Sequence, residues 1–426
     1  MSEIIIPNSS TFIAGNKFSN NKLTNVVIPN SVTYIDNSSF SKNRLKNLTI
    51  PNSVTYIGAH AFYQNKLETL IIPDSVTYIG YQAFAENQLT NVIIPSSITY
   101  IAEKTFSKNQ LTNIVIPNSV NYIGEYAFFG NKLTSIEIPN SVTYIGSYAF
   151  SNNDIENVII PNSINHISKS TFSNNQIKSI DIPNSVNYIG SYAFYKNQLK
   201  TLIIPDSVTY IGYSAFGGNQ LTNVKIPNSI KSIRAYTFAN NELKNIKIPN
   251  SINYIGPFAF YNNKLEDITI PDSVTYIGYC AFTGNQLKNV KLPNSISYIA
   301  SQTFSNNKLE NVEIPNSVRY IGNRAFSGNQ LTNVIMHESV IHIDSYAFYN
   351  NKLESIIIPS SVTYIGHAAF GNNKLNEITF LNKNKNVYYS NSMFGNQMPE
   401  KIKGYNNSWA ESFAKEKGIN FLAIEQ

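Results

Sequence analysis

The chain has 426 residues, of which 42% are hydrophobic and 14% are charged, and its formal net charge is +6. The charged residues are dispersed without a run of like charges, and this pattern argues against nucleic acid or an anionic lipid surface as the partner. Cys280 is the single cysteine, which excludes a disulfide framework and a cluster of thiolate metal ligands.

The N-terminal residues MSEIIIPNSS have no charged segment followed by an apolar stretch, so we expect no signal peptide here. No segment approaches the length of a membrane span, and we expect no membrane insertion. Ile6 and Pro7 already lie in the register of the pattern that follows. Two interpretations are open: the chain is a fragment of a longer protein, or its first unit caps itself.

A 22-residue repeat then runs along the chain, as the step from Phe18 to Phe40 shows. This phenylalanine recurs seventeen times up to Phe370, and an asparagine follows each one three residues later, from Asn21 to Asn373. A proline keeps the same spacing, with one histidine in its column. Seventeen units without a gap predict a solenoid in which each unit forms one turn.

A weaker period, of three units, lies on top of this repeat. Most units have a glycine four residues before the phenylalanine. The residues that replace this glycine in every third unit are Asp36, Ala102, Ser168, Arg234 and Ala300. This pattern indicates that the array grew by duplication of blocks of three units.

Residues 23–35, LTNVVIPNSVTYI, indicate the form of one unit. Their apolar residues are spaced 3, 2, 4 and 3 apart, which fits a chain winding around a core better than a helix or a long strand. Val26 and Ile28 alternate with outward positions as in a short strand, and Pro29 ends that strand because proline has no N–H to donate. We expect stacked turns to pair these strands in a parallel sheet with a spacing of roughly 4.8 Å.

Three further columns are predicted to be structural. The phenylalanines should fill the far side of the core, and the asparagines should bond backbone groups of adjacent turns. Gly58, Gly80 and Gly124, with their equivalents, are expected to mark a bend with positive φ, because glycine adopts that conformation most readily.

The last part of the chain, residues 381–426, leaves the 22-residue period. The sequence predicts a helix that starts at Ser408, whose capping box is completed by Glu411, and that ends at Gly418. A final strand is expected over residues 419–424. This segment is therefore predicted to cap the C-terminal end of the array.

The pattern LxxLxIPxSVxxIGxxAFxxN resembles the leucine-rich repeat subclass of Treponema pallidum-type and BspA-like proteins. One unit carries it as Leu67, Leu70, Ile72, Pro73, Ser75, Val76, Ile79, Gly80, Ala83, Phe84 and Asn87. The resemblance covers about residues 2–380 and implies a leucine-rich-repeat solenoid, curved as a horseshoe or arc. We expect it to be monomeric and mostly β, with one short parallel strand in each unit. The predicted domains are an array of about 17 units over residues 1–380 and a C-terminal capping unit with a helix over residues 381–426.

No motif for catalysis or cofactor binding is found, so we expect neither an enzyme nor a cofactor. The histidines are far apart in the array, and only His337 and His342 share one unit, so no metal site is expected. Glu137 and Asp181 project from the same strand column two turns apart. Their separation is available to glycosidase-like pairs, but we interpret them as part of a solvated strand face.

Two columns are candidate binding surfaces. The first is the outward position of the strand, which changes from Ile203 to Lys225, Lys247 and Lys291. A uniform ladder cannot specify where a partner binds, whereas this change in charge can. The alternative is that aliphatic residues in the column only reflect strand propensity.

The second column is aromatic and includes Tyr210, Tyr254 and Tyr276. Stacked tyrosines stabilise neighbouring turns through ring contacts, and they also offer amphipathic contact area or a platform for sugars. We interpret the column as a structural ladder and keep binding as the alternative.

Resemblance to BspA-like proteins implies a binding solenoid that acts in adhesion or in contact with a cell or host surface. Its ligand would be a protein or glycan of another cell or matrix, and its location would be the cell surface or the exterior. The absence of a signal peptide favours the alternative, an intracellular structural or scaffold protein. Localisation is therefore left open.

Overall fold

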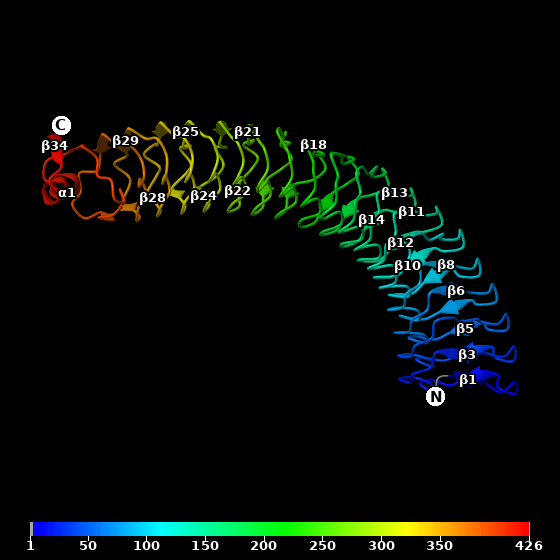
Figure 1. Cartoon of the computed structure of the whole chain (residues 1–426). Helices are drawn as coiled ribbons and strands as arrows, with labels where there is room; N and C mark the ends of the chain where they lie inside the picture. The colour runs from blue at the N-terminus through cyan, green and yellow to red at the C-terminus, as the bar shows by residue number, and fades with distance from the viewer. Residues whose placement is uncertain (1–2, 426) are drawn as a thin grey trace. The chain divides into compact units, whose positions relative to one another are not determined.

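The structure is a computed structural model that describes residues 3–425, so Met1 and Ser2 of the predicted array lie outside the described residues. It comprises two compact units, Met1–Gln220 and Leu221–Gln426. Within each unit, 22-residue turns stack as a parallel β-solenoid (Figure 1). Most turns contribute a strand of three or four residues directly before the proline column, on what we call the proline face. Nearly every turn also contributes a two-residue strand, centred on the tyrosine column, on the tyrosine face.

The strands of the first unit fall into these two sets. The proline face carries β1 (Glu3–Ile5), β3 (Asn25–Val27), β6 (Thr69–Ile71), β8 (Asn91–Ile93), β11 (Ser135–Glu137), β13 (Asn157–Ile159) and β16 (Thr201–Ile203). The tyrosine face carries β2 (Phe12–Ile13), β4 (Tyr34–Ile35), β5 (Tyr56–Ile57), β7 (Tyr78–Ile79), β9 (Tyr100–Ile101), β10 (Tyr122–Ile123), β12 (Tyr144–Ile145), β14 (His166–Ile167), β15 (Tyr188–Ile189) and β17 (Tyr210–Ile211).

The second unit repeats the arrangement. Its proline face carries β18 (Asn223–Lys225), β21 (Asp267–Thr269), β23 (Asn289–Lys291), β25 (Asn311–Glu313), β27 (Asn333–Ile335), β29 (Ser355–Ile358), β31 (Glu377–Phe380), β33 (Lys401–Gly404) and β34 (Asn420–Ala423). Its tyrosine face carries β19 (Ser232–Ile233), β20 (Tyr254–Ile255), β22 (Tyr276–Ile277), β24 (Tyr298–Ile299), β26 (Tyr320–Ile321), β28 (His342–Ile343), β30 (Tyr364–Ile365) and β32 (Tyr388–Tyr389).

The predicted parallel solenoid is thus confirmed, but the pattern did not predict the second strand of each turn. Two residues are too few to show the alternation by which a strand is recognised in a sequence. The short strands form because the register pairs like with like: Tyr122 lies opposite Tyr144, and Ile123 lies opposite Ile145.

The core of each turn is built from the phenylalanine and asparagine columns. Phe194 is 0% exposed, and its ring stacks 5.7 Å from Phe172 and 5.6 Å from Phe216. The Nδ2 group of Asn197 donates to the carbonyls of Phe172 (2.9 Å) and Phe194 (3.1 Å). Its Oδ1 accepts the N–H of Ile177 at 3.0 Å. The asparagine therefore ties two turns together, which confirms the role predicted for this column.

The glycine column works differently from the prediction. Gly58, Gly80 and Gly124 do not have positive φ, and the left-handed conformation occurs two residues later, as at His60 (φ 57°). A Cβ on Gly58 would lie 2.6 Å from the backbone nitrogen of Asn37 in the preceding turn. Glycine is needed because two backbones approach closely here, and the expectation of a positive-φ bend was wrong.

The tyrosine-face ladder is interrupted where this glycine is replaced. In the first unit the breaks lie between β7 and β9 and between β12 and β14, and in the second unit between β22 and β24. Ala102, Ser168 and Ala300 directly follow β9, β14 and β24. Asp36 is an exception, because its N–H keeps a bond of 3.0 Å to the carbonyl of Ile13 and its ladder continues. Asp344 likewise keeps a bond of 2.9 Å to the carbonyl of Ile321, so an added Cβ alone does not break the ladder. At the other three sites the short strands of the two turns are not paired.

The spacing of stacked rings differs along the tyrosine column and between the tyrosine and phenylalanine columns. Across the break before β24, the rings of Tyr276 and Tyr298 are 6.0 Å apart, compared with 4.8 Å for the preceding tyrosine pair. In the first unit, stacked rings of the tyrosine face are 4.2–4.8 Å apart, and the phenylalanine rings behind them are 5.3–5.9 Å apart. On the proline face the strands pair mostly in twos, whereas those of the tyrosine face form runs of three to five.

The proline face consequently lacks the continuous sheet that we expected. Residues 47–49 and 113–115 make only the single bridges Thr49↔Ile71 and Ile93↔Val115. Residues 179–181 and 245–247 form no strand. These four segments recur in every third turn and belong to the turns in which the glycine is replaced. The turn that contains Ala300 is an exception, because its residues 311–313 form β25 and pair with β27. In four of the five turns, replacement of the glycine is therefore accompanied by weak or absent strand pairing on the proline face.

The C-terminal segment folds as predicted from its capping signals. Helix α1 (Trp409–Lys417) begins after Ser408, whose Oγ accepts the N–H of Glu411 at 3.4 Å, and Gly418 ends it in the left-handed conformation (φ 68°). The Glu411 carboxylate reaches Asn407, one residue before the expected partner, at 2.6 Å. Strand β34 then pairs in parallel with β33. The division of the chain at residue 380 stays a prediction.

Candidate binding surface

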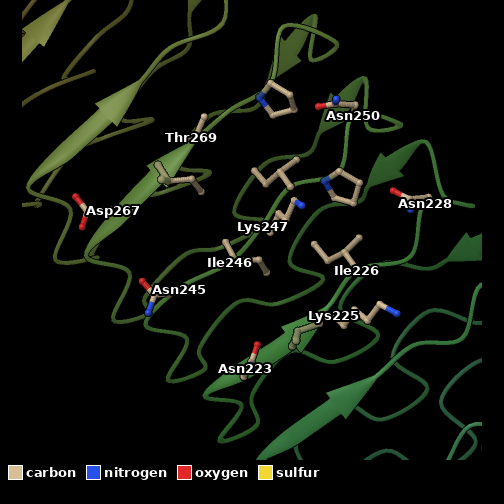
Figure 2. A pocket seen from close by; sticks show the side chains of 15 residues that line it. Asn223, Lys225, Ile226, Asn228, Asn245, Ile246, Lys247, Asn250, Asp267 and Thr269 are labelled. Atoms are coloured by element: carbon tan, nitrogen blue, oxygen red, sulfur yellow. The ribbon is translucent and has the colours of Figure 1, made fainter.

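A hollow lies on the proline face of the second unit (Figure 2). Its volume is about 890 Å³, and three consecutive turns line it, at positions within 223–228, 245–250 and 267–271. Its middle turn is the one without a strand. Ile246 is only half-buried, whereas the equivalent Val224 and Ile268 are 4% and 5% exposed. The hollow therefore forms where the middle turn does not close against its neighbours.

Two rows of polar side chains cross this hollow. The first positions of the three strand segments supply Asn223, Asn245 and Asp267, and the third positions supply Lys225, Lys247 and Thr269. Figure 2 shows the amide and carboxylate groups of the first row set apart from the two ammonium groups. The Asp267 carboxylate accepts a hydrogen bond of 3.1 Å from Asn289. The end of the hollow nearest the prolines is thus positively charged.

The first unit has a smaller hollow of about 530 Å³ on its proline face. It is lined by β11, β13 and the strandless residues 179–183. Glu137 and Asp181 both line it, so the structure does bring these carboxylates to one hollow. The two units therefore carry similar hollows with opposite charge.

Comparison with known proteins identifies the repeat. The profile described as a BspA type leucine-rich repeat region (6 copies) matches residues 1–112, 99–221, 211–328 and 298–408. The chain belongs to this BspA-type leucine-rich repeat family. No curated protein matches the chain.

Several solved structures resemble this BspA-type chain at low identity. The pneumococcal vaccine antigen PcpA is 20% identical, with a TM-score of 0.46 over 88% of this chain and 85% of that one. A leucine-rich repeat protein from Bacteroides ovatus is 24% identical, with a TM-score of 0.42 over 87% of this chain and 88% of that one. YopM from Yersinia enterocolitica is 19% identical, with a TM-score of 0.45 over 87% of this chain and 81% of that one.

The structure of the BspA-type chain brings together two of the predicted lysines. Lys225 and Lys247 line the same hollow, and both are exposed. Lys291 is exposed on β23 opposite Thr269 and lies outside the lining. Ile203 lies on β16 of the first unit, where it is 71% exposed. The change from isoleucine to lysine along the strand column therefore coincides with a hollow in the surface.

The predicted aromatic residues lie on the tyrosine face. Tyr254 stacks on Tyr276 with centroids 4.8 Å apart and planes 3° apart. Tyr210, in the first unit, stacks 4.4 Å from Tyr188. In the second unit, Figure 1 places β22, β24 and β28 on the opposite side of the turns from β21, β25 and β29. The structure thus separates Tyr254 and Tyr276 from the lysines of the hollow, and ring stacking supports the interpretation of a structural ladder.

Packing on the tyrosine face also shifts the pKa values of two side chains, Tyr320 and His342. Burial and a hydrogen bond of 2.6 Å to Asp344 raise the pKa of Tyr320 to about 12. Burial lowers the pKa of His342, whose ring stacks between Tyr320 at 4.4 Å and Tyr364 at 4.0 Å. Each shift favours the neutral form of the ring, as expected for groups packed in a stack.

Residues 3–425 contain neither a cluster of metal-binding side chains nor a membrane-spanning helix. In that range no three histidine, cysteine, aspartate or glutamate side chains lie close enough together to hold a metal ion. The single helix there, α1, is too short to span a membrane.

Reasoning from sequence missed the strandless segments 179–181 and 245–247. The signal was present in the three-unit period, because each segment follows a replaced glycine by eleven residues. The sequence alone did not show that replacement of this glycine is accompanied by lost pairing between turns.

Proposed function

We propose that this chain is a non-enzymatic protein-binding solenoid that acts in adhesion or in contact with a cell or host surface, and that its partner lies on the proline face. The hollow that contains Lys225 and Lys247 is the observation that carries the proposal. Membership of a leucine-rich repeat family supports protein binding as the general role. The hollow supports the location, because it combines shape and charge at one place on a repetitive surface.

Attachment of the purified chain to cells, matrix proteins and glycans tests this proposal. Replacing Lys225, Lys247 and Lys291 together with threonine keeps strand propensity and removes three exposed charges. At about 0.2–1 kcal/mol for each exposed ion pair, we expect attachment to weaken about 3- to 150-fold at low salt, and less at high salt. Circular dichroism should show an unchanged fold.

The matched control replaces Tyr210, Tyr254 and Tyr276 with threonine. If attachment survives the lysine changes but disappears in this tyrosine variant while the fold is kept, the tyrosine face is the binding surface. If the chain attaches to no cell, matrix protein or glycan, the alternative of an intracellular scaffold is favoured.

A further inference from the structure

The middle segment of the larger hollow has unused backbone groups. Between residues 3 and 425, no backbone hydrogen bond joins Asn245, Ile246 or Lys247 to either neighbouring turn. On the far side, β21 pairs with β23 through three residues. N–H and C=O groups beside an open strand edge are the groups to which an added peptide strand bonds.

The charge beside this segment is also unpaired. Lys225 and Lys247 are exposed, and within the described range neither ammonium group has an ion-pair partner. The one carboxylate in the lining, Asp267, is in the other polar row and is bonded to Asn289. An incoming carboxylate would therefore meet two available cations without displacing an existing ion pair.

We infer that the hollow binds an extended acidic segment of a partner protein. The segment pairs its backbone with Asn245–Lys247 and directs alternate carboxylate side chains at Lys225 and Lys247. The volume of about 890 Å³ lies in the range of about 300–1,000 Å³ typical of ligand sites. This inference rests on the proposed function and specifies the chemistry of the partner at the same site.

The smaller hollow provides an internal comparison. Residues 179–181 likewise have no backbone hydrogen bond to a neighbouring turn within the described residues. Glu137 and Asp181 there would repel an acidic segment. If backbone availability alone decided binding, both hollows would bind the segment. They differ in charge and in volume, and the charge of the smaller hollow disfavours an acidic segment.

The test uses a fluorescent nine-residue peptide in which glutamate alternates with threonine, and measures its affinity for the full chain by fluorescence anisotropy. Lys225→Thr with Lys247→Thr should weaken binding about 2- to 30-fold. The control pair, Lys288→Thr with Lys308→Thr, removes two exposed charges from the same unit outside the hollow and should leave affinity unchanged.

A second peptide, methylated on alternate backbone nitrogens, keeps its charge but loses strand donors, and it should bind much more weakly. Hydrogen exchange supplies the location. The amides of Ile246 and Lys247 should exchange quickly in the free chain and become protected by the first peptide, whereas residues 179–181 should not change.

Three results would overturn the inference: equal binding by the methylated peptide, equal loss in both lysine pairs, or no protection at Ile246 and Lys247. The outcome is separable from the proposed function. If the acidic peptide fails to bind but replacement of the lysines still abolishes attachment to cells or matrix, the binding surface stands and the acidic segment is wrong. If attachment never depends on these lysines, the proposed location fails whatever the peptide does.

Discussion

The asparagine column gives the sharpest test of how the turns are held together. Asn197 is 6% exposed and satisfies three backbone groups: the carbonyls of Phe172 and Phe194 and the N–H of Ile177. Asn197→Ala leaves the N–H of Ile177 without a partner. The carbonyls of Phe172 and Phe194 each lose one of two donors, because they also accept from Asn175 (3.1 Å) and Asn219 (3.0 Å). A buried group left without its partner costs about 1–3 kcal/mol, and a bond lost by a carbonyl that keeps a second donor costs about 0.5–1.5 kcal/mol, so the range is about 2–6 kcal/mol. Water that enters the vacated space would keep the total toward the low end, and we expect about 2–4 kcal/mol.

Native-state hydrogen exchange is the appropriate assay, because the stability of a stacked array is local. The amide of Phe194, which donates to Ala215 at 2.9 Å, keeps its acceptor in the variant and reports the stability of the turn. Its exchange should accelerate about 30- to 700-fold, since about 1.4 kcal/mol corresponds to a factor of ten. Fluorescence of Trp409 is less useful, because this residue lies in the C-terminal helix of the other unit.

The matched control is Asn187→Ala. Asn187 is exposed in the same region of the array, and its side chain makes no hydrogen bond within residues 3–425. We expect a change within about 0.5 kcal/mol. If Asn197→Ala costs no more than this control, then the asparagine ladder does not hold the turns together and the reasoning from its three bonds is refuted.

Four further predictions follow from the same packing. Gly146→Ala should destabilise the first unit by about 1–3 kcal/mol in thermal melts, because its Cβ would lie 2.5 Å from the nitrogen of Glu125; an unchanged melting temperature would contradict close approach as the role of the glycine. Phe194→Ala should cost about 3–5 kcal/mol, with faster hydrogen exchange confined to nearby turns rather than spread uniformly over the array. The raised pKa of Tyr320 predicts a stability contribution that is complete below pH 10 and lost between pH 10 and about 12, and Tyr320→Phe should reduce this loss in urea titrations. The lowered pKa of His342 predicts a contribution present above pH 6.5 and lost as the pH falls; His342→Tyr should flatten the urea midpoint between pH 8 and 5, and an equal fall in both chains would argue against it.

The sequence determined the turn and its interior. A 22-residue period kept without a gap can be satisfied only by stacking equivalent residues, so the phenylalanine and asparagine columns had to lie in register. The capping residues Ser408 and Gly418 likewise defined α1, because a cap depends only on a few neighbouring residues. The change in charge at Lys225 and Lys247 was also visible in the strand column.

The tertiary structure decided how far apart the turns lie, and with that the binding surface. The role of Gly58 depends on a backbone atom of Asn37 in the preceding turn, which no pattern within a single unit describes. Replacement of that glycine every third unit accompanies the broken ladders and the strandless residues 245–247. The lysines lie beside a hollow because residues 245–247 do not pair with the neighbouring turns. The charges of this surface were therefore visible in the sequence, whereas the hollow itself depends on how the turns stack.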